Sequence, residues 1–182
     1  HRETEVLPVD FGGGFQTGIA VSIVYQLRQR LGLDQPGTPV KVVEVYQMLG
    51  EIKPDLANIF GVDTACLCGT GTMFGFPAVE FKEWKLADGT PVLVPRDFNT
   101  DYEPNGDLLQ YPGGDKSVPP SGHMPAGGHF FDAILRQPPI DEDKLDPADN
   151  CEEFGLISDA ELEVYRRRAG ELHAHTDQAV FC

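Results

Sequence analysis

The segment Tyr111–Asp132, YPGGDKSVPPSGHMPAGGHFFD, constrains the fold of this chain more than any other. Glycine and proline recur so densely in it that we expect neither a helix nor a central strand there. The segment nevertheless carries His123, His129 and the pair Phe130–Phe131, whereas disordered linkers are poor in aromatic residues. A loop of this length inside a compact domain is usually a lid or a binding loop. The pattern therefore predicts an enzyme-like chain with a long ordered loop.

Length and charge restrict the class of protein. The chain has 182 residues, of which 41% are apolar, so it can bury a core as one domain. Its 14 basic and 29 acidic residues give a net charge of −15. Such a surface repels phosphate groups and anionic lipid, so we expect no nucleic-acid partner and no membrane binding.

The cysteine content and the chain ends suggest a compartment and an origin. Four cysteines at irregular spacing are too few for a disulfide framework: Cys66, Cys68, Cys151 and Cys182. We therefore expect reduced thiols in a cytoplasmic protein, since no signal peptide opens the chain. The chain begins at a histidine and stops inside an apolar run, which we interpret as a fragment of a longer protein.

The first third of the chain predicts a strand, a glycine loop, helices and a second strand, in that order. The strands and helices expected are a strand over Val6–Phe11, helices over Ala20–Leu31, Val42–Leu49 and Pro54–Phe60, and a strand over Val62–Leu67. Gly32 and Gly61 are suitable helix stops. This order is typical of βα units with parallel strands.

The pattern then changes to antiparallel signals. Asp88-Gly89 lies between Phe81–Leu86 and Pro91–Val94, which is a strong hairpin signal. Asn105-Gly106, between Asp101-Tyr102 and Leu108-Leu109, is a second possible turn. Near the end, Ser158 and Glu161 form a capping box that predicts a last helix, followed by a strand over Gln178–Cys182. We expect three parallel strands with an antiparallel insertion at about residues 81–140.

The glycine run after the first strand is the first candidate site. Gly12, Gly13 and Gly14 could form a tight turn, bind an anion through backbone N–H groups, or face a substrate. In the substrate-facing interpretation, Phe15, Gln16 and Thr17 would contribute side chains. A dinucleotide fingerprint is the weaker alternative because the third glycine falls one place late.

Three titratable residues are candidate catalytic groups: Asp10, His123 and His129. A histidine in a long loop can titrate near neutral pH or bind an acidic group, or it can cap a turn. Asp10 stands at the end of the expected first strand, where it could act in a site or cap the loop.

Other clusters have a simpler interpretation. Cys66 and Cys68 would point to one face of a strand, as a soft metal pair requires, although buried cysteines are commoner there. His173 and His175 stand at a helix end, where imidazolium is favourable, so a zinc site with Cys182 is the weaker alternative. Arg166–Arg168 are expected on a solvated helix face.

Four segments follow one another along the chain: LPVDFGGG, GLDQPGTPVKVVEVYQMLGEIKPDLANIFGVD, YPGGDKSVPPSGHMPAGGHFFDAI and PPIDEDKLDPADNCEEFG. Their succession resembles the uroporphyrinogen decarboxylase superfamily. That superfamily includes methyltransferases that work with corrinoid proteins or coenzyme M. The resemblance covers nearly the whole chain. It implies an α/β fold in which residues 1–182 are the N-terminal part of one (β/α)8 TIM barrel, with a hairpin and loop insertion.

The resemblance also implies the chemistry. Decarboxylases of the superfamily place arginines in the loop after the first strand, whereas Phe11–Gln16 contains none. We therefore expect a methyltransferase-type member, with uroporphyrinogen III decarboxylation in haem biosynthesis as the alternative. A non-enzymatic module that binds a corrinoid protein is a further alternative. The substrate would be a small molecule, zinc or a corrinoid would belong to the full-length protein, and the fragment itself would be inactive.

Overall fold

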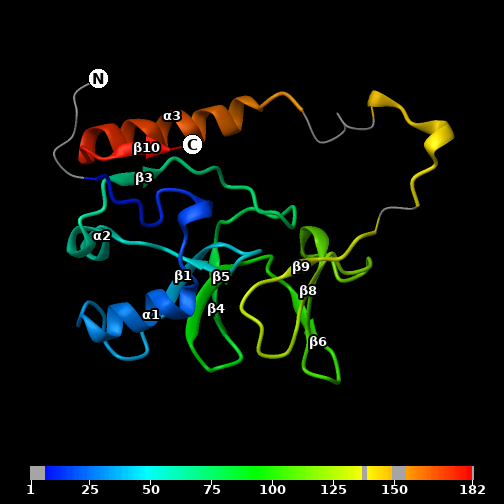
Figure 1. Ribbon diagram of the computed structural model, residues 1–182, viewed down its shortest axis with the longest axis horizontal. Coiled ribbons are helices and arrows are strands. Elements are labelled where there is room, and N and C mark those ends of the chain that lie inside the picture. The colour runs from blue at the N-terminus through cyan, green and yellow to red at the C-terminus, as the bar shows by residue number, and fades with distance from the viewer. Residues whose placement is uncertain (1–6, 137–138, 149–154, 182) are drawn as a thin grey trace.

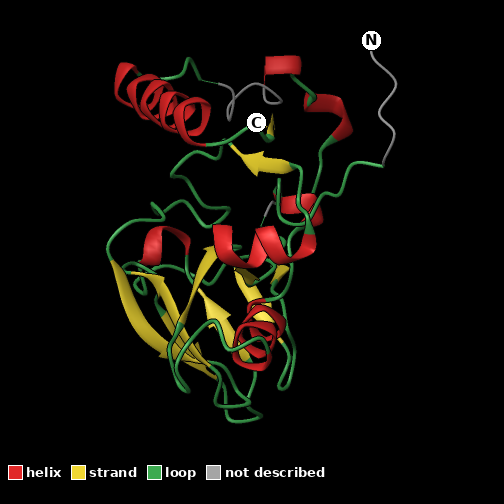
Figure 2. Cartoon of the chain, turned by 90° about the vertical axis from the view of Figure 1, so that its left-hand side faces the viewer, coloured by secondary structure: helices red, strands yellow, loops and turns green. Residues whose placement is uncertain are grey.

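The computed structural model describes residues 7–136, 139–148 and 155–181. The described strands form three separate sheets with the orders β2-β1-β5-β4, β6-β7-β8-β9 and β10-β3. Figures 1 and 2 show two parts: the two larger sheets lie together, and α3 with β3 and β10 forms a layer above them.

The first sheet is built around β1 (Val40–Glu44) and β5 (Pro91–Pro95), which pair in parallel. β2 (Leu49–Gly50) and β4 (Phe81–Lys85) complete the sheet as antiparallel edges. Helix α1 (Val21–Arg30) packs against β1 and β2. The helix expected over Val42–Leu49 is wrong, because alternate residues of β1 are buried and its valines suit an extended chain.

The second sheet contains β6 (Thr100–Tyr102), β7 (Leu108–Gln110), β8 (Gly122–Met124) and β9 (Asp132–Ala133), all antiparallel. β8 lies inside the segment where no central strand was expected, so that expectation is wrong. The prolines at positions 119, 120 and 125 stand just outside this short strand, and its backbone donors stay available for the ladder. The same segment also holds the 3-10 turn η2 (Pro112–Gly114).

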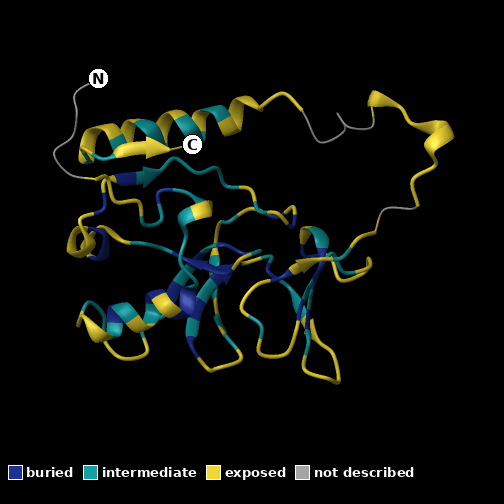
Figure 3. Cartoon of the chain, in the orientation of Figure 1, coloured by how far each residue is buried: buried dark blue, intermediate teal, exposed yellow. Residues whose placement is uncertain are grey.

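One aromatic core joins these two sheets. Phe131 is fully buried and meets Phe74 and Phe98 at centroid distances of 5.5 and 6.1 Å, both edge-on. Trp84 of β4 packs on Phe98 at 5.3 Å. Figure 3 shows the buried residues concentrated along these strands and α1. Residues of the expected insertion thus share one core with β1 and α1, namely Val92, Val94, Phe98, Leu108, Met124 and Phe131.

The upper layer consists of β3, α3 and β10, and strands β4 to β9 lie between β3 and α3 in the sequence. β3 (Thr64–Cys66) pairs in parallel with β10 (Ala179–Phe181), and α3 (Asp159–His175) precedes β10. The capping box of Ser158 and Glu161 is confirmed, with Glu161 N–H donating to Ser158 Oγ at 3.2 Å. The helix expected over Pro54–Phe60 is confirmed as α2.

The expected partial (β/α)8 barrel is wrong. Within the described residues the sheets are separate and mostly antiparallel, and no barrel is closed. Residues 7–10 of the expected first strand form no strand, although Asp63 N–H donates to Val9 O at 2.8 Å. Local patterns correctly indicated that β3 and β10 are parallel strands. The segment of β1, part of which was expected as a helix, is a strand that pairs in parallel with β5 from the expected insertion.

The described residues also include the 3-10 turns η1 (Phe15–Thr17) and η3 (Glu142–Lys144). No helix among the described residues is both long and apolar enough to cross a membrane.

Candidate functional site

A large cleft separates the α3–β3–β10 layer from the first sheet. Its volume is about 1180 Å³, above the roughly 300–1,000 Å³ of ordinary small-molecule sites. We call it the interlayer cleft. The lining residues used below are Gly12, Gly14, Phe15, Lys41, Glu51, Cys66, Cys68, Arg168 and His175.

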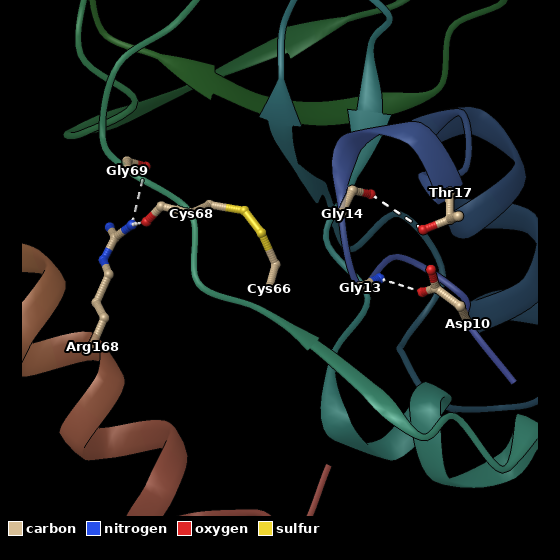
Figure 4. Close-up of a disulfide and its surroundings, with 8 residues drawn as sticks. All are labelled: Asp10, Gly13, Gly14, Thr17, Cys66, Cys68, Gly69 and Arg168. Atoms are coloured by element: carbon tan, nitrogen blue, oxygen red, sulfur yellow. Dashed lines mark hydrogen bonds between the residues drawn. A yellow bond between two sulfur atoms is a disulfide. The ribbon is translucent and has the colours of Figure 1, made fainter. Parts of the chain in front are cut away.

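The glycine loop forms one wall of the interlayer cleft. The Asp10 carboxylate accepts from Gly13 N–H at 2.9 Å (Figure 4). It also accepts from Thr64 Oγ1 at 2.7 Å. The hydrogen bond from Thr64 is the main reason that the pKa of Asp10 lies below its usual value, although burial opposes it. Asp10 therefore caps the glycine loop, one of the two roles expected for it, and its catalytic role stays a prediction.

The turn itself requires glycine at position 12. Gly12 adopts φ +82°, and a Cβ there would meet Ile52 Cγ1 at 2.6 Å. Its N–H donates to Thr17 O at 3.1 Å, which closes the loop. Of the six candidate substrate-binding residues, Gly12, Gly14 and Phe15 line the interlayer cleft, whereas Gly13, Gln16 and Thr17 do not.

Across the interlayer cleft, Cys66 and Cys68 are joined by a disulfide at the end of β3 (Figure 4). Their Cα atoms are 5.4 Å apart, and both residues are half-buried. The expectation of reduced thiols is wrong for this pair, because i,i+2 spacing on a strand places both sulfur atoms on one face. In this state neither sulfur is a thiolate ligand for a metal.

Helix α3 brings Arg168 to the same turn. Its Nη1 donates to Cys68 O and, at 3.1 Å, to Gly69 O. Tyr165, one helical turn earlier, also lies against this turn, because a Cβ on Gly69 would meet its hydroxyl at 2.6 Å. The solvated face expected for Arg166–Arg168 is therefore wrong for Arg168, which is half-buried, whereas Arg166 and Arg167 are exposed.

The loop histidines do not line the interlayer cleft. His123 of β8 lies 2.8 Å from Asp107, whose other oxygen accepts from Ala126 N–H. The hydrogen bond from His123 is the main cause of a lowered Asp107 pKa. His129 is exposed. The structure thus gives His123 the role of bracing the β6–β7 turn.

Glu103 completes a cluster with Asp107 and His123 in which the potential ligand atoms lie within 4.8 Å of one another. Hydrogen bonds to His123, Ala126 and Asn105 already account for the position of Asp107. The cluster therefore does not by itself indicate a metal.

No sequence pattern indicated that Lys41, Arg168 and His175 would lie in the interlayer cleft. Lys41 of β1 pairs with Glu51 at 3.1 Å and lies over the Phe81 ring at 4.8 Å. Arg168 and His175 come from a helix more than 100 positions away from the glycine loop. Neither spacing nor periodicity links such residues, so only the tertiary structure could bring them together.

Comparisons with known proteins do not indicate a family. A scan against protein-family models and searches of curated proteins and of solved structures find no match to this chain.

Proposed function

We propose that this chain belongs to an enzyme that binds a small molecule in the interlayer cleft, with methyl transfer as the reaction. The reaction class comes from the sequence resemblance to the uroporphyrinogen decarboxylase superfamily. The observation that supports the site is the position of Gly12, Gly14 and Phe15. These residues, selected from sequence as substrate-facing, line a cleft large enough for a bulky ligand.

The residues that line the interlayer cleft supply binding groups of different kinds. Phe15 offers an apolar surface, and the glycine loop allows a ligand to approach the backbone closely. Lys41 of β1 and Glu51, which follows β2, provide a charged pair. These groups can hold and orient a ligand that has both apolar and polar parts.

A zinc-bound thiolate or a corrinoid would supply the methyl chemistry in the proposed enzyme. The described residues do not fit a zinc site in the cleft, because the sulfur atoms of Cys66 and Cys68 are bonded to each other. The acidic cluster around His123 contains no sulfur and does not line the cleft. We therefore route no step through a metal held by these residues.

Decarboxylation is the second candidate, and one observation favours it. The glycine loop has no arginine, but Lys41 and Arg168 bring two cationic groups to the interlayer cleft from other segments. Cationic groups of this kind can bind the carboxylates of a substrate. A non-enzymatic module that binds a corrinoid protein is a third candidate.

A pair of glycine variants tests the proposed site. Gly14→Leu adds a side chain beside the interlayer cleft without demanding a left-handed backbone, and only the flexible end of Gln16 lies near its Cβ. Gly71→Leu is the matched control, because a Cβ there meets open space and Gly71 does not line the cleft. Binding of methylcobalamin and of uroporphyrin is measured by calorimetry.

We expect Gly14→Leu to weaken binding at least roughly tenfold, the effect of losing about 1.4 kcal/mol of contacts, and Gly71→Leu to leave it unchanged. Methylcobalamin as the preferred ligand would support methyl transfer, and uroporphyrin would support decarboxylation. Equal affinity in Gly14→Leu and the parent chain, or no binding of either compound, would refute the proposed site.

A further inference from the structure

We propose that Cys66–Cys68 is a redox-active disulfide that exchanges with small thiols in the interlayer cleft, and that Arg168 selects thiols bearing a carboxylate. This activity goes beyond the function proposed above. It uses the same cleft but requires neither methyl transfer nor decarboxylation.

The position of the disulfide favours a chemical role over a structural one. A cross-link restrains an unfolded chain less as the loop it closes becomes shorter, and this one spans a single intervening residue. The segment is also held already by the β3–β10 ladder and by Leu67 N–H, which donates to Phe181 O at 2.6 Å. Both cysteines line the interlayer cleft, so a small thiol can reach the bond.

Arg168 supplies a positive charge that the described residues leave uncompensated. Its Nη1 contacts are to two neutral carbonyl oxygens, and within the described part of the chain no carboxylate lies within 4.0 Å of its guanidinium. By contrast, Arg28 contacts two carboxylates and Arg167 contacts Glu171.

This local charge opposes the charge of the whole protein. A chain with a net charge of −15 repels anions, so attraction at one site requires a cation placed at that site. A guanidinium has five N–H donors in a fork that matches a carboxylate, and Arg168 uses only Nη1 for the carbonyls. Its remaining donors can bind a carboxylate of a thiol that approaches Cys68.

The exchange proceeds in two steps. A substrate thiolate attacks one sulfur of the disulfide, the Cys66–Cys68 bond breaks, and a mixed disulfide forms while the other cysteine leaves as a thiolate. A second substrate thiolate then attacks the mixed disulfide and releases the substrate disulfide and the second cysteine thiolate. Two electrons pass from two substrate thiols to the protein, and both cysteines take protons from water. The positive charge of Arg168 stabilises the departing thiolate.

Rates of disulfide reduction by three thiols test the proposal. The thiols are 3-mercaptopropionate (anionic), 2-mercaptoethanol (neutral) and cysteamine (cationic). Samples are quenched by alkylation, and peptide mass spectrometry follows the Cys66–Cys68 peptide separately from Cys151 and Cys182. Arg168→Gln is compared with Arg166→Gln, which removes the same charge from an exposed position on the same helix.

We expect reduction of the Cys66–Cys68 bond in the parent chain. We compare the rate of reduction by 3-mercaptopropionate with the rate of reduction by 2-mercaptoethanol. The ratio of these two rates should be roughly fivefold or more lower in Arg168→Gln than in Arg166→Gln, as expected for the loss of one unit charge about 4 Å away in water. The cationic-to-neutral ratio should rise. High salt should reduce both differences, and using ratios removes the intrinsic reactivity of each thiol.

The two parts of the proposal fail in different ways. A Cys66–Cys68 bond that resists all three thiols at the rate of a buried control disulfide would refute the redox role. Equal rate ratios in Arg168→Gln and Arg166→Gln would refute selection by Arg168. Arg168→Lys keeps the charge, so a folded Arg168→Lys protein with the ratio of Arg168→Gln would also refute it.

Discussion

The two parts of this molecule are stabilised in different ways. The two larger sheets share a core of fully buried side chains that includes Val42, Val92, Phe98 and Phe131. The layer of α3, β3 and β10 is held mainly by backbone and polar contacts, and α3 contains no buried residue. Figure 3 shows this contrast directly, with exposed residues along α3 and β10.

The contrast places the interlayer cleft at a boundary between unequal parts. Its lower wall rests on a packed sheet, whereas its upper wall carries Arg168, His175 and the disulfide on weakly packed elements. Regions with few buried apolar contacts open at low free-energy cost, and ligand-binding elements are often of this kind. If the proposed ligand binds in the interlayer cleft, we therefore expect it to order the upper layer.

The largest expected effect tests the packed part. Phe131→Ala removes a fully buried ring from the aromatic core and should destabilise the protein by about 3–5 kcal/mol. Phe130→Ala is the matched control, because its ring is 55% exposed, and it should cost under about 1 kcal/mol. Urea denaturation measures both, and equal costs would show that the two sheets do not share one core.

The second prediction concerns a buried charge in the same part. Arg28 is 2% exposed and its guanidinium contacts Asp34 at 2.5 Å and Asp55 at 2.8 Å. Arg28→Met should destabilise the protein by roughly 2–3 kcal/mol, less than for a fully buried pair, because Asp55 is partly exposed.

Arg28 also predicts the acid stability. Hydrogen bonds from Arg28 lower the pKa of Asp34 and bring the pKa of Asp55 from 3.8 to about 2. Stabilisation by these carboxylates is thus complete above about pH 4 and is lost as the pH falls toward 2. The free energy of unfolding should decline over that window in the parent chain and be flatter in Arg28→Met. The same slope in both proteins would contradict this assignment.

The smallest effect belongs to the upper layer. Ser158→Ala removes the side chain that caps α3 and should cost about 1 kcal/mol. Hydrogen exchange should show faster exchange in α3 and β10 but unchanged protection in β1, β5 and β7. An Ser158→Thr variant retains the cap and serves as the control. Uniformly faster exchange across all sheets would mean that the two parts unfold as one unit.

Local signals were sufficient where neighbouring residues decide the structure. The capping box at Ser158, the helix beginning at Pro54 and the Asp88-Gly89 hairpin all lie where the sequence predicted them. Each depends on contacts between residues a few positions apart. The glycine loop was also recognisable, although only half of its candidate residues line the cleft.

The sequence by itself therefore determined the caps and the turns, because short-range sterics and hydrogen bonding decide them. Only the tertiary structure decided that Val40–Glu44 is a strand beside β5, that the sheets form no barrel, and that Arg168 meets Cys68. Those outcomes depend on which apolar faces bury each other and on side chains about 100 positions apart, and no local pattern records such long-range choices.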